Sequence, residues 1–246
     1  MPRQFLQSLF GRLSTPDTRP VVTLTFAQSL DAKIGGKDSQ QLLSGKESML
    51  MTHWMRSFHD AILIGIGTAL NDNPQLNTRL LLPQDQRHLP RPIILDSTLR
   101  LSPDCKLLTN YRAQKGRRPY IIAADTFLDD VNWKSRRATL EAAGARILTV
   151  PLQGDLLHFP SILKSLRDLA ITSLMIEGGA RVISSLLTTH PDLIDIIVIT
   201  VAPLLVGDQG VAYHGGLAPS QFKHLATHVV GTDSIVTLAA HNLLSI

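Results

Sequence analysis

The chain has 246 residues, of which 44% are hydrophobic and 18% charged, a balance typical of a globular protein and not of a disordered one. Its single cysteine excludes an intramolecular disulfide and a cysteine-rich zinc site, and no apolar run is long enough to cross a membrane. The net charge of +4 suits an enzyme that binds phosphorylated ligands, whereas 5% aromatic residues and no basic runs interleaved with aromatics argue against nucleic-acid binding.

Residues 1–20 form an N-terminal extension, with Arg3, Arg12 and Arg19 around a short apolar patch. The patch lacks the apolar core and cleavage site of a secretory signal, so a short helix packed on the domain is expected. We expect a cytoplasmic protein, and the sequence leaves a mitochondrial transit peptide open.

The first half of the chain alternates apolar strands with short helices. The helix expected at 47–58 has Ser44 as its expected N-cap, with Glu47 three residues later. The expected elements are a strand at 21–27, a loop at 29–36, a helix at 47–58, a strand at 61–65, a short helix at 67–70, an exposed excursion at 82–91 and a strand at 92–96.

The second half repeats this alternation and ends in two strands. The expected elements are strands at 120–124, 145–150, 174–176 and 194–201, helices at 133–143, 159–169 and from 180 to about 188, and antiparallel strands at 225–230 and 234–239. Several strands are apolar on both faces, which is typical of parallel sheets covered by helices. The sequence therefore predicts an α/β fold with a mixed, mostly parallel central sheet flanked by helices and an antiparallel C-terminal edge. No linker divides residues 21–246, so they are expected to form one domain.

Glycines follow two of the buried strands and lead directly into helices. Gly65 and Gly67 follow one strand, and Gly178 and Gly179 follow another, directly after Glu177. Each pair alone is best explained as a tight strand–helix turn. Two such turns at the carboxyl ends of parallel strands favour a ligand site, because helix N-termini attract phosphate and glycines let it approach the backbone.

A third strand end carries hydroxyl groups and a cation. Ser97 and Thr98 follow the strand at 92–96, and Arg100 lies two residues after Thr98. This combination suits a phosphomonoester such as the 2′-phosphate that distinguishes NADPH from NADH. A simple polar turn explains the segment equally well.

Six motifs occur in order along residues 21–210. They are Ala27-Gln-Ser-Leu-Asp-Ala-Lys-Ile, Ser44-Gly-Lys-Glu-Ser, Asp60-Ala-Ile-Leu-Ile-Gly-Ile-Gly-Thr-Ala-Leu-Asn-Asp-Asn-Pro, Arg91-Pro-Ile-Ile-Leu-Asp-Ser, Met175-Ile-Glu-Gly-Gly-Ala and Ala202-Pro-Leu-Leu-Val-Gly. As an ordered set they resemble the riboflavin-biosynthesis reductase family, whose fold is like that of dihydrofolate reductase. The chain is similar to the stand-alone fungal or archaeal type. The bacterial type adds a zinc deaminase with a Pro-Cys-x-x-Cys motif, which a chain with one cysteine cannot hold.

The resemblance implies NADPH-dependent reduction of 2,5-diamino-6-(5-phosphoribosylamino)pyrimidin-4(3H)-one to the ribitylamino product, by hydride transfer to ribose C1′. It places the cofactor against Ala27, Thr68, Asp72, Ser97, Gly178, Gly179, Ala180, Arg181, Val182 and Ile183. It places the substrate near Ser39, Arg56, Leu76, Arg79 and Glu177. Glu177 and Asp31 are the candidate catalytic groups, although an Asx-turn explains Asp31 more simply. No metal is expected.

The resemblance also implies a homodimer, since relatives pair near residues 194–206, which are too apolar for a solvated sheet edge. The chain departs from many relatives at Gln41, where they carry a tryptophan-containing motif, and at Thr25, where they carry a lysine. A catalytic lysine on the first strand is therefore not supported. Cys105 and the histidines, among them His53 and His59, are expected to be inert, surface or packing residues.

Two other functions stay open at this point. One is a different pteridine or pyrimidine reductase on the same fold, which the cations Arg56 and Arg79 disfavour because a phosphosugar needs such partners. The other is a non-catalytic nucleotide-binding regulator, which the presence of both glycine turns, Thr68 and Glu177 disfavours.

Overall fold

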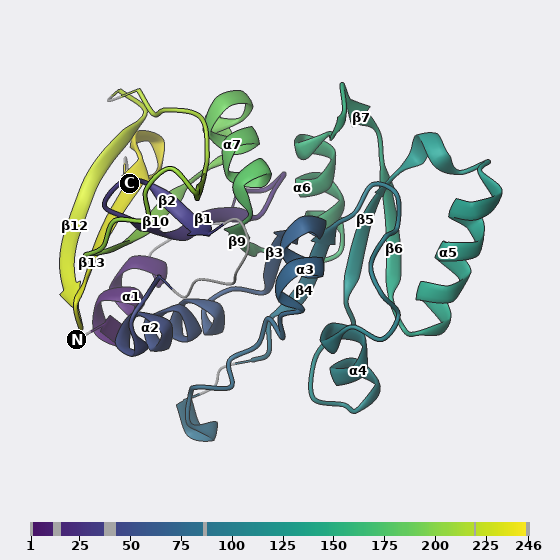
Figure 1. Cartoon of the computed structure of the whole chain (residues 1–246), viewed down its shortest axis with the longest axis horizontal. Coiled ribbons are helices and arrows are strands. Elements are labelled where there is room, and N and C mark those ends of the chain that lie inside the picture. The colour runs from purple at the N-terminus through teal and green to yellow at the C-terminus, as the bar shows by residue number, and fades with distance from the viewer. Residues whose placement is uncertain (1, 12–15, 37–42, 86–87, 219, 245–246) are drawn as a thin grey trace.

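A computed structural model describes residues 2–11, 16–36, 43–85, 88–218 and 220–244. Its centre is a nine-stranded sheet in the order β12-β13-β10-β1-β9-β3-β4-β5-β6 (Figure 1). The strands are β1 (Val21–Ser29), β3 (Ala61–Gly65), β4 (Arg91–Leu95), β5 (Tyr120–Ala124), β6 (Arg146–Val150), β9 (Ser173–Gly178), β10 (Ile196–Ala202), β12 (Phe222–Val230) and β13 (Asp233–Ala240).

The pairings from β10 to β6 are parallel, whereas β13 pairs antiparallel with both β10 and β12. The two C-terminal strands are joined by a two-residue turn, in which Gly231 has a φ of 63° that favours glycine. The expected mixed, mostly parallel sheet with an antiparallel C-terminal edge is therefore confirmed.

Seven helices in the described residues cover the sheet: α1 (Pro2–Phe10), α2 (Lys46–Ser57), α3 (Ile66–Asp72), α4 (Lys106–Arg112), α5 (Val131–Ala142), α6 (Phe159–Asp168) and α7 (Ala180–Thr189). Side chains of α1 to α5 join one hydrophobic core, and those of α6 and α7 join a second. Along β3, Ile62 and Ile64 enter the first core while Ala61 and Leu63 enter the second. Because successive strand residues point to opposite faces, each helix layer covers its own face of the sheet.

Two short ribbons and four single turns complete the described fold. β2 (Lys33–Gly36) pairs with β11 (Gly210–Ala212), and β7 (Leu152–Gln153) pairs with β8 (Leu156–Leu157). The 3₁₀ turns are η1 (Pro83–Asp85), η2 (Asp125–Phe127), η3 (Pro191–Leu193) and η4 (His241–Leu244).

The N-terminal extension contains the expected short helix. Helix α1 packs beside α2 (Figure 1). The Leu6 side chain of α1 is fully buried in the first core. The η1 excursion is tied to α1 by an ion pair between Arg3 and Asp85 at 2.8 Å. No described helix is both long and apolar enough to cross a membrane.

Several sequence expectations were wrong in detail. The segment 29–36, expected as a loop, contains β2, because its backbone finds a partner 174 or more residues later in β11. Helix α4 was not predicted, since only Leu107 and Leu108 anchor this seven-residue element. Ser44 does not cap α2; Gly45 holds the N-cap position, and its N–H donates to Asp233 Oδ2 at 2.8 Å.

The apolar character of β10 has another cause than the one expected. The strand lies between β1 and β13 inside the sheet and is not an edge. Its residues are apolar because both its faces are covered, as in other central parallel strands. The pattern at 194–201 therefore gives no argument for a dimer.

Candidate functional site

A cavity of about 790 Å³ opens at the carboxyl ends of the parallel strands. Ala27 of β1, Gly65 of β3, Leu95 of β4 and Glu177 of β9 all line it. The β2–β11 ribbon and the residues of β8 add apolar walls on its outer side. Ligands of open α/β sheets bind at this end of the strands, and the volume suits a molecule of dinucleotide or drug size.

The turn between β9 and α7 brings the backbone close to its neighbours. Gly178 and Gly179 have φ angles of 83° and 85°, in a region that disfavours other residues. A Cβ on Gly179 would lie 2.6 Å from Thr68 Oγ1, and one on Gly178 would lie 2.8 Å from the Ile183 side chain. Only glycines therefore fit here. Helix α7 begins at Ala180, so its positive dipole end faces the cavity wall and favours an anionic ligand group.

The end of β4 places a cation at the cavity. Arg100 and Ser97 both line the cavity, and the Arg100 side chain is 57% exposed. Its Nε lies 3.9 Å from Asp96 Oδ1, and the buried Asp96 carboxylate accepts a hydrogen bond from the Leu101 N–H at 2.8 Å. Burial raises the pKa of Asp96, with these contacts opposing the rise. Asp96 therefore fixes the turn that presents Arg100.

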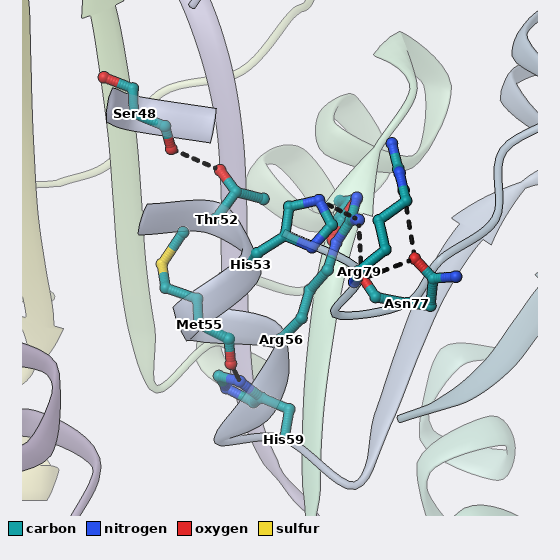
Figure 2. Close-up of polar contacts among 9 residues, drawn as sticks. Ser48, Thr52, His53, Met55, Arg56, His59, Asn77 and Arg79 are labelled. Atoms are coloured by element: carbon teal, nitrogen blue, oxygen red, sulfur yellow. Dashed lines mark hydrogen bonds and ion pairs between the residues drawn. The ribbon is translucent and has the colours of Figure 1, made fainter. Parts of the chain in front are cut away.

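Glu177 and Arg56 form a two-point ion pair in the cavity wall. Arg56 Nε donates to Glu177 Oε1 at 2.6 Å and Arg56 Nη2 donates to Oε2 at 2.7 Å. Their side chains are 10% and 15% exposed, so the pair is largely shielded from solvent. Arg56 Nη1 also donates to the Asn77 carbonyl oxygen at 3.1 Å (Figure 2). The pair fixes the Glu177 carboxylate and offsets the charge of Arg56. Because its charge is offset by Glu177, Arg56 is less suited to bind the ribose phosphate directly than the sequence suggested.

Arg79, unlike Arg56, has no described carboxylate within ion-pair distance, so its positive charge is available to a ligand. Its Nη1 donates to Asn77 Oδ1 at 3.2 Å (Figure 2). Partial burial and the neighbouring Arg56 lower the pKa of Arg79, while Glu177 opposes them. Arg56, Arg79 and Glu177 together carry a net charge of +1, which favours binding of an anionic group beside them.

His53 is a buried neighbour of Arg56 that does not itself line the cavity, and sequence reasoning did not connect it with the site. The side chain has no exposed surface, so of the two expected roles, surface or packing, His53 has the packing one. Its Nε2 is 3.5 Å from Arg56 Nη1, and its buried Nδ1 has no hydrogen-bond partner among the described residues (Figure 2). Burial, then Arg56 and Arg79, lowers the pKa of His53 to about 3, so the ring is neutral at ordinary pH. The signal in the sequence is its position three residues before Arg56 on one helix face.

Asp31 has a structural task outside the cavity wall. Its carboxylate accepts hydrogen bonds from Ser29 Oγ at 2.5 Å and from the N–H groups of Val206 and Gly207 at 3.1 and 2.7 Å. These bonds lower the pKa of Asp31 to about 2. Asp31 is thus an ionised clamp between two loops. The structure does not support it as a catalytic acid, and its partners across the chain extend beyond the expected local turn.

The cavity gathers most of the predicted residues from segments far apart in the chain. Those that line it are Ala27, Arg56, Thr68, Asp72, Ser97, Glu177, Gly179, Ala180, Arg181, Val182 and Ile183. Gly178 and Arg79 do not line it, and Ser39 and Gln41 lie outside the described residues. Leu76 is a correction: its side chain is buried in the first core, so it offers the cavity no side-chain contact.

Other cavity residues gave no signal in the sequence. Thr52, Asp155 and Thr200 line the cavity because the fold brings α2, the β7–β8 turn and β10 to it. Cys105 is buried, and burial raises the pKa of its thiol, which matches the expectation of an inert residue. The described residues contain no cluster of three His, Cys, Asp or Glu side chains that could hold a metal ion.

Comparison with known proteins identifies the family. A model of the RibD C-terminal domain matches residues 20–236. The chain belongs to the RibD C-terminal domain family. A similar member is the 2,5-diamino-6-ribosylamino-4(3H)-pyrimidinone 5′-phosphate reductase of Debaryomyces hansenii, 37% identical over 224 residues that cover 87% of this chain and 88% of that one.

Another family member, the riboflavin biosynthesis protein RibD of Aquifex aeolicus, is 32% identical over 77% of this chain and 48% of its own length. Among solved structures of the family, the riboflavin biosynthesis reductase Rib7 of Saccharomyces cerevisiae has a TM-score of 0.73 and 26% identity, covering 96% of this chain and 98% of that one. The likeness to the stand-alone fungal reductases, which the motifs over residues 21–210 predicted, extends beyond those motifs to nearly the whole chain.

Proposed function

We propose that this protein is an oxidoreductase of riboflavin biosynthesis that reduces 2,5-diamino-6-(5-phosphoribosylamino)pyrimidin-4(3H)-one to the 5-phosphoribitylamino product with NADPH. The names of its fungal relatives support the reaction. The observation that carries the proposal is one cavity lined both by the glycine turn of β9–α7 and by the fixed Arg56–Glu177 pair. The first suits a phosphate-bearing cofactor and the second a polar substrate.

The glycine turn fits a dinucleotide. Any side chain at Gly179 would strike Thr68, so the bare backbone leaves room for a diphosphate beside the start of α7. Ser97 and Arg100, at the end of β4, would hold the 2′-phosphate. Thr68 and Asp72 on α3 offer hydrogen bonds along the cofactor. When bound, the nicotinamide would supply the hydride that reduces ribose C1′.

The opposite wall would orient the substrate. Arg56 holds the Glu177 carboxylate in one orientation, where it can accept hydrogen bonds from substrate amino or hydroxyl groups. Arg79, which does not itself line the cavity and forms no ion pair with a described carboxylate, would attract the ribose phosphate through its positive charge. These residues contribute position and electrostatics, and the apolar walls from β2, β8 and β11 exclude water.

The test incubates purified protein with NADPH and the phosphoribosyl substrate and follows the loss of reduced-nicotinamide absorbance together with formation of the ribityl product. A second reaction supplies dihydrofolate in place of the pyrimidine. Turnover with the pyrimidine alone supports the proposal. Turnover only with the pteridine would identify another reductase, and NADPH binding without any turnover would identify a non-catalytic nucleotide-binding protein.

We further propose that residues 21–246 form one reductase domain behind the extension of residues 1–20, since the nine-stranded sheet draws strands from β1 to β13. A homodimer and a cytoplasmic location stay predictions. With β10 inside the sheet, we place the pairing surface around Leu30 and Leu205, which are 62% and 73% exposed and are two of several exposed large hydrophobic residues. A hydrogen bond from Leu30 N to Leu204 O at 2.9 Å brings the two loops together.

A further inference from the structure

Four arginines gather at the amino ends of β4, β5 and β6, the end of the sheet opposite the cavity. Arg91 and Arg146 are the first residues of β4 and β6, and Arg117 and Arg118 precede β5. The strand register aligns Arg91 with Arg118, and it pairs Tyr120 with Arg146. Since residues two apart point to the same face, Arg91, Arg118 and Arg146 lie on one face of the sheet. Arg117 lies close enough to Arg91 for its charge to lower the pKa of Arg91. We call these four residues the arginine cluster.

The cluster is held in place by contacts that do not neutralise it. Arg118 donates from Nε and Nη2 to the carbonyl oxygens of Gly144 and Ala145, at 3.0 and 2.8 Å. Arg91 Nη1 donates to the Arg118 carbonyl oxygen at 2.8 Å. The guanidinium carbons of Arg91 and Arg146 lie 4.2 and 5.3 Å from the centre of the Tyr120 ring. Arg91, Arg118 and Arg146 are therefore held by neutral partners while several of their N–H donors remain available.

The cluster brings together arginines that have no described acidic partner, whereas six other described arginines are paired with carboxylates. Arg3, Arg19, Arg56, Arg100, Arg112 and Arg137 each have a carboxylate within 4 Å. In the part of the chain that the structure describes, none of the four cluster arginines has one. Burial, with the neighbouring arginines, lowers the pKa of Arg91, and only Tyr120 opposes the shift. Positive charges held this close repel one another, and a bound anion would offset that repulsion by attracting each of them.

We infer that the arginine cluster is a binding site for the polyphosphate chain of a small molecule, separate from the cavity. Arginine forks match phosphate oxygens, and three adjacent strands spread them over about 10 Å, wider than one phosphate group. The Tyr120 side chain is only 6% exposed, so its ring is not available to stack on a base. The site therefore recognises the phosphate chain, and ATP and inorganic tripolyphosphate should bind with similar affinity.

The test measures tripolyphosphate binding by isothermal titration calorimetry on the wild-type chain and on the double variant Arg117→Gln/Arg146→Gln. We expect saturable binding to the wild type and at least about tenfold weaker binding to the variant, because each charged hydrogen bond lost accounts for about that factor. Thermal unfolding checks that the double variant is folded. If it is not, the single variant Arg117→Gln, at an exposed position, carries the same expectation.

The matched control is the double variant Arg136→Gln/Arg167→Gln. It removes the same net charge from two arginines that donate only to backbone carbonyl oxygens elsewhere. The control should bind tripolyphosphate like the wild type. The inference is overturned if the wild type does not bind millimolar tripolyphosphate, if both double variants lose affinity equally, or if ATP binds far more tightly than tripolyphosphate through the cluster.

Discussion

Replacing Glu177 with glutamine tests the proposed substrate wall most directly. The substitution keeps the shape of the side chain but removes the charge that meets Arg56 at 2.6 and 2.7 Å. A charged hydrogen bond to substrate contributes about 1.5–3 kcal/mol, so kcat/KM should fall about 10- to 150-fold. NADPH affinity should stay unchanged, because the glycine turn and Arg100 hold the cofactor in the proposed arrangement.

The same substitution also leaves Arg56 without its counter-ion, so stability needs its own control. The pair is 10% and 15% exposed, and breaking a buried pair costs about 3–5 kcal/mol, with the lower end expected for an isosteric change. Asp195→Asn breaks a comparable pair, since Asp195 meets Arg19 at 2.6 and 2.8 Å before the amino end of β10, away from the cavity. Urea unfolding should show stability losses in both variants.

Steady-state kinetics then separate the two effects. Only Glu177→Gln should lose kcat/KM toward the pyrimidine substrate, while Asp195→Asn keeps it at temperatures where both are folded. The reasoning is refuted if Glu177→Gln keeps full kcat/KM, if it loses NADPH binding instead, or if Asp195→Asn loses as much activity.

The remaining predictions concern the cofactor, pH and assembly. Wild-type protein should have a higher kcat/KM with NADPH than with NADH, and Arg100→Ala should narrow that difference; equal values in the wild type would contradict a 2′-phosphate site. The free energy of unfolding should fall as pH drops from about 6.5 to about 4, because His59 and His53, with pKa values lowered to about 4 and about 3 by burial, stay neutral when folded but gain protons when unfolded. His59→Gln should flatten this slope in denaturant titrations, and an unchanged slope would argue against its lowered pKa. Light scattering at micromolar concentration should give the mass of a dimer, Leu205→Asp should shift it toward a monomer, and a wild-type monomer would rule the dimer out.

The sequence by itself determined the fold class and much of the cavity. Strands buried on both faces must be apolar throughout, so β3, β4, β5 and β9 could be predicted from short apolar runs. Their order along the chain, alternating with helices, predicts parallel pairing. Because parallel strands end at one edge, the residues following them, among them Thr68, Ser97 and Gly179, could be expected to share a site.

Only the tertiary structure decided which charges meet. Arg56 and Glu177 are 121 residues apart, and local pattern carries no information on a pair formed between a helix and a distant strand end. The same holds for Asp31, whose partners at 206 and 207 lie 175 and 176 residues away, and for β2 with β11. The packing of the sheet also made β10 an interior strand, where apolarity reflects burial by neighbours and not an exposed interface. Local propensity, periodicity and the order of elements can be read from the sequence, whereas contacts between particular residues far apart in the chain follow from the whole fold, so the first could be predicted and the second could not.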